Sequence, residues 1–209
     1  MKTITCMCEK QFEADIPDTI DVAAQPGILA EIIDGTFMNV TCPACHTVLK
    51  PEFPVTIFDG KADWEIRFVP ELVRQENMKH PPQLQGRKTM RLVIGYAELY
   101  EKMKIFAEKL DDRTVEYLKY VILSKVLEKT NSEEKDIDVY YTQKQGTDLI
   151  FHIKGLKDEE VGIFKIPEDL YRKTLAEIDR RAAEAPFCEF LSPPYVCLNR
   201  LYSWDEYDE

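Results

Sequence analysis

Long apolar segments are missing from this chain of 209 residues. Even its longest uncharged apolar runs are short, such as YVIL at 120–123, and stay far below the roughly 20 residues that cross a bilayer. The first residues, MKTITCMCEKQF, include neither an apolar stretch nor a small-residue cleavage site of the secretory kind. We therefore expect a cytoplasmic protein that has no membrane contact.

The sequence motifs of several enzyme classes are missing as well. The chain has only four serines, none within G-x-S-x-G, and it has no H-E-x-x-H. Neither G-x-x-x-x-G-K-[ST] nor G-x-G-x-x-G occurs, so the common phosphate-binding loops are absent. The three histidines, His46, His80 and His152, share no recognisable catalytic arrangement. The sequence leaves enzyme activity open and favours a non-enzymatic role.

Basic residues are fewer than acidic ones, 27 against 38. The formal net charge is −11 and the sequence pI is about 4.9. Residues 1–60 contain three lysines against nine acidic residues, a net charge of −6. Proteins that bind a phosphate backbone release counterions through basic patches, which this charge balance opposes. Nucleic acid is therefore an unfavoured partner, and the expected partner is another protein.

The distribution of apolar residues predicts an α+β fold. Strands are expected at 2–6, 11–20, 36–42, 47–59 and 63–70, with a short helix at 25–35 that Pro26 begins and Gly35 ends. The polar segment 75–89, which contains Pro-Pro, is predicted to be an exposed loop. We place a boundary near residue 80, between a β-rich zinc-ribbon-like module (1–80) and an α+β part (81–209) that can share its core.

The second part is predicted to pack helices on a small antiparallel sheet. A strand at 90–96 precedes two helices, the second capped by Asp111 or Asp112. A hairpin turning near Gly146 and a strand at 161–166 follow, then a helix at 167–184. Apolar residues at helical spacing predict the buried faces of the three helices: Tyr96, Leu99, Met103, Phe106 and Leu110; Val115, Leu118, Ile122 and Val126; Tyr171, Leu175, Ile178 and Ala182. The aromatic-rich C-terminal segment is expected to be irregular or briefly extended before an acidic tip.

Two cysteine pairs stand out near the start of the chain. Cys42-Pro43-Ala44-Cys45 has the spacing of a zinc knuckle, in which a tight turn brings two sulfurs together. Cys6-Met7-Cys8 is one residue shorter. We expect its two sulfurs to bind the same ion from an extended chain, where residues two apart point to one face. Each pair supplies half of a four-thiolate shell, so one structural zinc ion is expected on Cys6, Cys8, Cys42 and Cys45. Iron also accepts four thiolates.

Other interpretations of the pairs stay open. Cys42 and Cys45 could form the redox centre of a thiol-disulfide oxidoreductase, which requires a helix directly after Cys45. A disulfide framework is disfavoured in a cytoplasmic chain. Four inert buried thiols would have to fall by coincidence into two close pairs, each preceded by threonine. His46 could replace a weak ligand, although an exposed histidine is the simpler interpretation.

Further candidate residues have simple structural explanations. Cys188 and Cys197 could form a second metal or redox pair but are predicted to be buried small residues. Asp111 and Asp112 could act in acid–base chemistry, although a helix cap accounts for them. Trp204, flanked by acidic residues, is predicted to lie in a solvated terminus.

The sequence resembles the CpXC family, which is named for two cysteine-pair motifs. The segments that carry the resemblance are ITCMCEKQFEADI, TCPACHTVLKPEFPV, RFVPE and RLVIGYAELYEKMKIFAEKLDDRTVEYLK, which together span about residues 4–119. The resemblance implies metal binding through Cys6, Cys8, Cys42 and Cys45 and implies no activity. The first pair departs from the family pattern because it lacks the proline and one spacer residue.

The leading hypothesis is a non-enzymatic interaction or scaffold protein with a structural zinc site. One alternative is a thiol-disulfide oxidoreductase that uses Cys42 and Cys45. Another is a ligand- or nucleic-acid-binding role in the C-terminal part, which a pocket lined by converging polar groups would favour.

Overall fold

The computed structural model describes residues 1–84, 86–130, 136–157 and 160–201. The chain forms two compact units, Met1–Tyr100 and Glu101–Glu209. The boundary expected near residue 80, between two parts that can share a core, stays a prediction. Within the described residues, no helix combines the length and the apolar character needed to cross a membrane.

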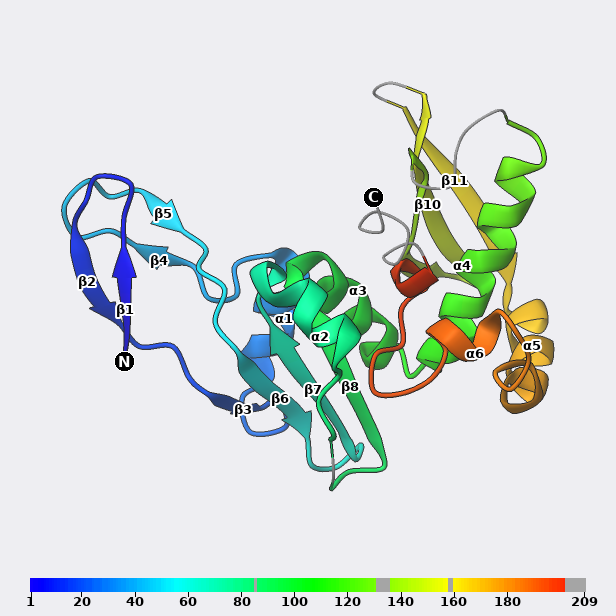
Figure 1. Ribbon diagram of the computed structural model, residues 1–209, viewed down its shortest axis with the longest axis horizontal. Coiled ribbons are helices and arrows are strands. Elements are labelled where there is room, and N and C mark those ends of the chain that lie inside the picture. Colours follow the sequence, from blue (N-terminus) through cyan, green and yellow to red (C-terminus); the bar gives the residue numbers. More distant parts are fainter. Residues whose placement is uncertain (85, 131–135, 158–159, 202–209) are drawn as a thin grey trace. The chain divides into compact units, whose positions relative to one another are not determined.

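Two short hairpins carry the cysteine pairs in the first unit. In one, β1 (Lys2–Thr5) pairs antiparallel with β2 (Gln11–Ala14). In the other, β4 (Val40–Thr41) pairs antiparallel with β5 (Val48–Leu49). Figure 1 shows the two hairpins beside each other, and the cysteine contacts described below agree with this arrangement.

A four-stranded mixed sheet forms the rest of this unit. It is composed of β3 (Thr19–Asp21), β6 (Val55–Asp59), β7 (Trp64–Val69) and β8 (Thr89–Ile94), in the order β3-β6-β7-β8. The β6–β7 pair is antiparallel, whereas β3–β6 and β7–β8 are parallel. A parallel pair requires a crossover connection, and a helix lies in each of these two connections. The predicted strands 11–20 and 47–59 are wrong as continuous elements, since each is divided between two sheets, into β2 and β3 and into β5 and β6. The parallel pairing was not predicted either.

The first crossover helix ends as its sequence predicts, whereas the second was not expected. α1 (Pro26–Asp34) begins at its proline, and Gly35 closes it with φ 84°, its N–H directed to the carbonyls of Glu31 and Ile32. α2 (Arg74–Lys79) occupies the start of the segment 75–89 that was predicted to be an exposed loop. That prediction is wrong for α2, because Met78 is 3% exposed and fixes one face of the helix to the protein.

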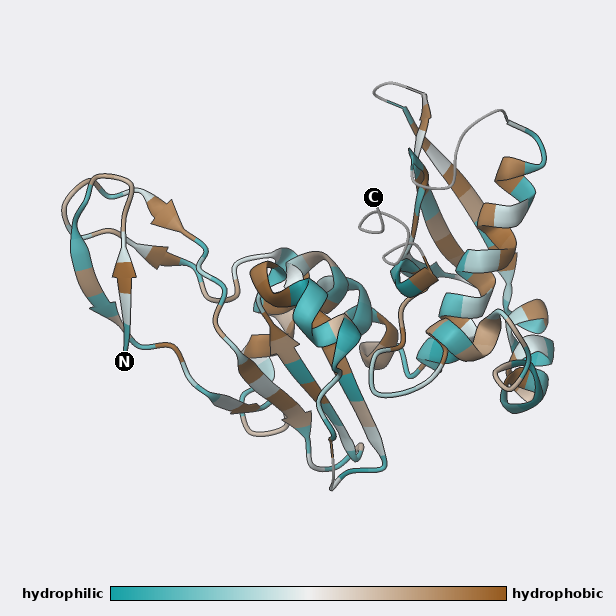
Figure 2. Cartoon of the chain, viewed as in Figure 1, coloured by the Kyte–Doolittle hydropathy of each residue, from teal (hydrophilic) through white to brown (hydrophobic). Residues whose placement is uncertain are grey.

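The second unit is built on a three-stranded antiparallel sheet of order β11-β10-β9. Its strands are β9 (Asp138–Gln145), β10 (Asp148–Lys157) and β11 (Glu160–Pro167). Gly146, with φ 61°, forms the predicted turn between β9 and β10. Figure 2 shows apolar residues alternating with polar ones along these strands, as expected for a sheet with one buried face.

Helices complete the second unit and confirm the α+β class. They are α3 (Gly95–Ala107), which begins in the first unit, α4 (Asp112–Leu127), α5 (Glu168–Arg181) and the short α6 (Phe187–Phe190). Side chains from α4, the sheet, α5 and the C-terminal segment form one core, which includes Val115, Leu118, Ile122, Phe151, Ile178 and Phe190.

Burial on α5 differs from the predicted face at one position. Tyr171 and Ile178 are buried as predicted, but Leu175 is 39% exposed and Thr174 is buried in its place. Thr174 lies three residues after Tyr171 and can be buried because its hydroxyl donates to the carbonyl of Leu170 at 2.9 Å. The prediction for Leu175 is therefore wrong.

The C-terminal segment is more deeply buried than an irregular tail. Between α6 and a 3-10 turn, η3 (Leu198–Leu201), Leu191, Tyr195 and Val196 are each 1% exposed. The predicted solvated terminus with Trp204 lies outside the described residues.

The register of β10 with β11 shifts between Ile153 and Lys157, and a substitution of Gly155 tests the backbone conformation there. Gly155 has φ 86°, and a Cβ there would lie 1.7 Å from the carbonyl oxygen of Asp136. Gly146 has a similar φ of 61° but open space around it. We expect Gly155→Ala to destabilise the protein by about 2 kcal/mol or more and Gly146→Ala by about 1 kcal/mol. In both variants an alanine is held in the left-handed conformation, and only at position 155 does its Cβ also clash with the backbone. Urea unfolding of both variants measures the difference, and equal losses would contradict the close approach.

Candidate metal centre

The first cysteine pair lies in the turn between β1 and β2. The N–H of Cys6 donates to the carbonyl of Lys10 at 2.9 Å, and the N–H of Glu9 donates to the carbonyl of Cys6 at 2.9 Å. Glu9 has φ 67°, a left-handed conformation that reverses the chain immediately after Cys8. The expectation of an extended chain with two sulfurs on one face is wrong, since a tight turn brings the sulfurs together instead.

The second pair repeats this arrangement with one additional residue. The N–H of Cys42 donates to the carbonyl of Thr47 at 2.9 Å, and the N–H of His46 donates to the carbonyl of Cys42 at 3.0 Å. His46, which follows the second cysteine as Glu9 does in the first turn, has φ 59°. The shorter spacing of Cys6 and Cys8 is therefore accommodated by a turn that is one residue tighter, because Glu9 bonds back three positions and His46 four.

The two turns bring the four sulfurs into one cluster. Cys6 Sγ lies 3.6 Å from Cys45 Sγ, and Cys8 Sγ lies 3.7 Å from Cys42 Sγ. All four sulfurs lie within 4.8 Å of one another. Four sulfurs at the usual zinc–sulfur distance of about 2.3 Å in a tetrahedron are separated by about 3.8 Å. The donor set and its spacing thus fit one tetrahedral metal ion.

Burial divides the cluster into an inner and an outer half. Cys6 is 4% exposed and Cys42 is fully buried, whereas Cys8 and Cys45 are exposed. Each pair contributes one sulfur to each half. An ion held by these sulfurs would link the two hairpins at their buried side while its outer ligands remained near solvent.

Hydrogen bonding around the sulfurs favours thiolates at two positions. The pKa of the Cys45 thiol is lowered to about 6, first by the Thr47 hydroxyl, whose Oγ1 lies 3.3 Å from Cys45 Sγ, and then by the Thr47 N–H. The backbone N–H groups of Cys45 and Ala44 lower the pKa of Cys42. Thiolates are the form in which cysteine binds metal.

The innermost thiol behaves in the opposite way. The backbone N–H of Cys8 lowers the pKa of Cys6, but burial and hydrogen bonds to the other three thiols outweigh it and raise the pKa to about 12. Because Cys42 and Cys45 already favour the thiolate form, a third negative charge at Cys6 requires a cation beside it. A metal ion at the centre of the cluster would supply that cation.

A lysine ties the second cysteine hairpin to the rest of its unit. Lys50, directly after β5, donates to the carbonyl of Gly35 and to the hydroxyl of Tyr100. Its Nζ lies 4.5 Å from the ring centroid of Tyr96 and 4.6 Å from that of Tyr100. The hairpin is thereby connected both to the end of α1 and to α3.

The other candidate residues from the sequence lie apart from this cluster. His46 is exposed and is not one of the four clustered residues. Cys197 is buried as predicted, and Cys188 is half-buried. The side chain of Asp111 caps α4 by accepting from the N–H of Thr114 at 2.8 Å, which confirms the cap. His152 packs edge-on against Tyr140 within the sheet.

Thr47 is the site residue that sequence reasoning missed. Its carbonyl closes the second turn, and its hydroxyl and N–H both act on Cys45. Its position two residues after Cys45 was visible in the sequence, but only the turn brings its hydroxyl back to the sulfur.

A group of buried charges in the second unit was also not predicted. Lys102 lies 2.9 Å from Asp112 and donates to the carbonyl of Val196 at 2.8 Å. Asp112 therefore does not share the capping role of Asp111, because it is 2% exposed and paired with a buried lysine.

The same group continues along α4. Lys119 lies 2.8 Å from Glu101 and 3.1 Å from Glu116. The other oxygen of Glu101 accepts from the N–H of Tyr141 at 2.6 Å. The Glu116 oxygen that faces Lys119 also accepts from the N–H of Leu198 at 2.9 Å, and its second oxygen lies 3.8 Å from Lys102. Because these charges are paired with one another and with backbone groups, the group holds α3, α4, β9 and the C-terminal segment together.

The fold and the site together define an α+β protein with a four-cysteine cluster that could hold a metal ion. Residues 4–119 match the family described as CpXC protein, and since this is more than half of the chain, the chain belongs to that family. The family resemblance of the cysteine motifs is thus confirmed. The chain is also similar to a protein of Treponema pallidum (strain Nichols) named "Uncharacterized protein", with 23% identity over 202 residues that cover 87% of this chain and 90% of that protein. No solved structure matches the chain.

Proposed function

We propose that Cys6, Cys8, Cys42 and Cys45 hold one structural zinc ion and that the protein has a non-enzymatic interaction or scaffold role. The observation that carries this proposal is the four-sulfur cluster, whose members all lie within 4.8 Å of one another. Four protein ligands complete a tetrahedral shell and leave no position for water or substrate. The ion would supply a cross-link between two hairpins that are too short to be stable alone.

The local structure after Cys45 disfavours the redox alternative. A nucleophilic thiol in a C-x-x-C motif is activated at the start of a helix, but the chain continues from Cys45 into β5 of a hairpin. The low pKa of Cys45 does not separate the two interpretations, because metal ligands and redox nucleophiles both act as thiolates. The partner we expect is another protein, since the charge balance opposes nucleic acid and the buried Lys119 of α4 is already paired with acidic residues.

Metal analysis of freshly purified, tag-free protein tests the proposal. We expect about one zinc ion per chain and four thiols that become reactive when a chelator removes it. Thiol counts before and after chelation, alongside elemental analysis, measure both quantities. Protein that is folded without metal and has a reactive Cys42 would contradict the proposal and favour the thiol-disulfide oxidoreductase.

A further inference from the structure

The two edges of the sheet in the second unit differ in what covers them. At the β9 edge, the N–H of Tyr141 donates to Glu101 at 2.6 Å, and the N–H of Lys144 donates to Glu108 at 3.2 Å. Glu101 of α3 and Glu108, directly after α3, thus accept hydrogen bonds from this edge. At the other edge, β11 pairs only with β10 among the strands of the described residues. β11 therefore presents an edge to which a further strand can be added.

The centre of β11 is apolar and exposed. Ile163 is 63% exposed and Val161 is 46% exposed. Alternation along the strand places both on the face opposite the core, whereas Ile166, on the other face, is buried. Natural edge strands are commonly protected by charge, proline or a bulge at their middle. In β11, Ile163 and Phe164 form the middle, Lys165 follows them and Pro167 is at the end. The register shift of this hairpin lies in the partner strand β10, between Ile153 and Lys157.

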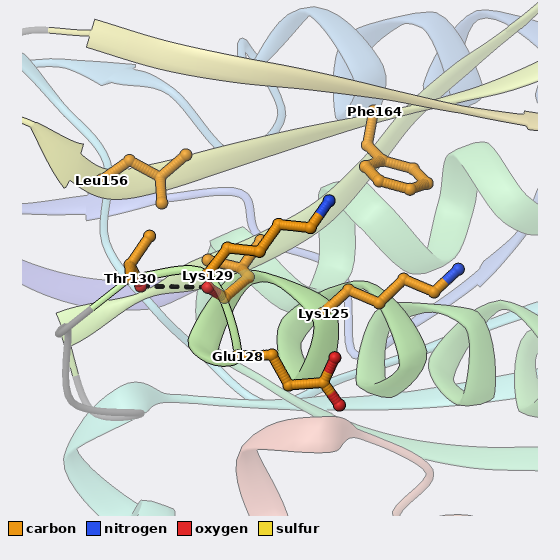
Figure 3. A pocket seen from close by; sticks show the side chains of 7 residues that line it. Lys125, Glu128, Lys129, Thr130, Leu156 and Phe164 are labelled. Carbon is orange, nitrogen blue, oxygen red and sulfur yellow. Dashed lines mark hydrogen bonds between the residues drawn. The ribbon is translucent and has the colours of Figure 1, made fainter.

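A hollow of about 500 Å³ lies beside the core face of β11. Figure 3 shows Phe164 and Leu156 on the strand side of the hollow, opposite Lys125 in the last turn of α4 and Lys129 just beyond the helix. Leu156 leans over Gly162, since a Cβ on that glycine would lie 2.9 Å from Leu156 Cδ1. A side chain placed opposite Gly162 on an added strand would therefore contact Leu156 and extend into the hollow.

We propose that β11 pairs antiparallel with β11 of a second copy of this chain, so that the two sheets form one continuous sheet of six strands. Directly opposed residues must share a face, which limits the register. The register that centres on Ile163 places it opposite its own equivalent, Val161 opposite Lys165, and Gly162 opposite Phe164. Each Phe164 then covers the glycine of the other copy and enters its hollow. A register centred on Gly162 would instead place Phe164 opposite Glu160.

Self-complementarity is the reason for choosing a second copy as the occupant. The strand supplies both the aromatic side chain and the glycine that accommodates it, and the two aromatic rings lie diagonally across the symmetry axis, within contact of each other. Local charge also permits the pairing. The chain has a net charge of −11, but this edge and hollow carry three lysines against two acidic residues: Lys125, Lys129, Lys165, Glu128 and Glu160.

A charge exchange at the symmetry axis tests the pairing in the full-length protein. We expect the wild-type chain to form a dimer, and Ile163→Glu and Ile163→Lys each to weaken it by about tenfold or more, because like charges then face each other. Mixing the two variants in equal amounts should restore the dimer, since Glu then faces Lys. Sedimentation equilibrium over a range of concentrations measures the dimer dissociation constant of the wild type, of each variant and of the mixture. Leu72→Glu, at a 94% exposed apolar residue of the first unit, is the matched control and should leave the dimer unchanged.

Restoration on mixing supports the pairing and also shows that both variants are folded. A wild-type protein that is monomeric at about 100 μM, well above typical working concentrations for a specific dimer, would overturn the proposal and leave the edge free for an extended peptide of another protein. A dimer that neither substitution weakens would overturn it too, because the copies would then associate through a different surface.

Discussion

Replacing both Cys42 and Cys45 by serine is expected to abolish metal binding and unfold the two cysteine hairpins. The short strands of these hairpins cannot persist alone, and the binding free energy of a structural zinc ion, of the order of 10 kcal/mol, is also folding free energy. We expect amide protection in residues 1–16 and 36–53 to fall by about a hundredfold or more in hydrogen exchange. The helical signal of α4 and α5 should remain, because these helices lie in the second unit.

Cys188→Ser is the matched control for this experiment. It removes a thiol that is not one of the four clustered cysteines, and metal content should stay at one ion per chain. A loss of metal in this variant would mean that the ligand assignment is wrong. If the double cysteine variant loses the helical signal as well, the two parts share one core and the boundary near residue 80 does not separate independently folding parts.

Replacing Lys119 by methionine is expected to destabilise the protein by about 3–5 kcal/mol. The substitution keeps most of the length of the side chain. It leaves Glu101 buried without its cation and leaves Glu116 with only Lys102, at 3.8 Å. Urea unfolding measures the loss. Arg180→Met is the matched control, because Arg180 pairs with Glu177 on the surface and its side chain is 67% exposed, so its loss should stay below about 1 kcal/mol.

The pH dependence of this loss identifies its cause. Burial raises the pKa of Glu101 even with Lys119 present, and removing the lysine raises it further. A carboxyl group whose pKa is higher in the folded than in the unfolded state stabilises the fold at low pH and loses that contribution as pH rises. The difference between Lys119→Met and wild type should therefore be smaller at pH 5 than at pH 8. A difference independent of pH would mean that lost packing, not unpaired charge, is responsible.

Neutralising the two acids should then recover part of the stability. In the triple variant Lys119→Met with Glu101→Gln and Glu116→Gln, the amide oxygens can still accept from Tyr141 and Leu198, and none of the three substituted positions carries a buried charge. Less stability in the triple variant than in the single one would contradict the assigned roles of the carboxylates.

Features that depend on a few neighbouring residues could be predicted from the sequence. The cysteine pairs indicated the cluster, Gly35 the end of α1, Asp111 the cap of α4 and Gly146 the hairpin turn. In each case the residue type acts through its own backbone conformation or through atoms within a few positions along the chain.

Features that depend on distant segments were decided only by the tertiary structure. Whether β3 and β6 pair in parallel depends on how the chain crosses between them, which no local pattern encodes. Lys119 resembles a surface residue until Glu101 and Glu116 lie within 3.1 Å of it in a buried position. The sequence by itself thus determined the four-cysteine cluster and the α+β class, because spacing and periodicity are local. The tertiary structure decided the buried charges and the open edge of β11, because burial and strand order arise only when segments far apart in the chain meet.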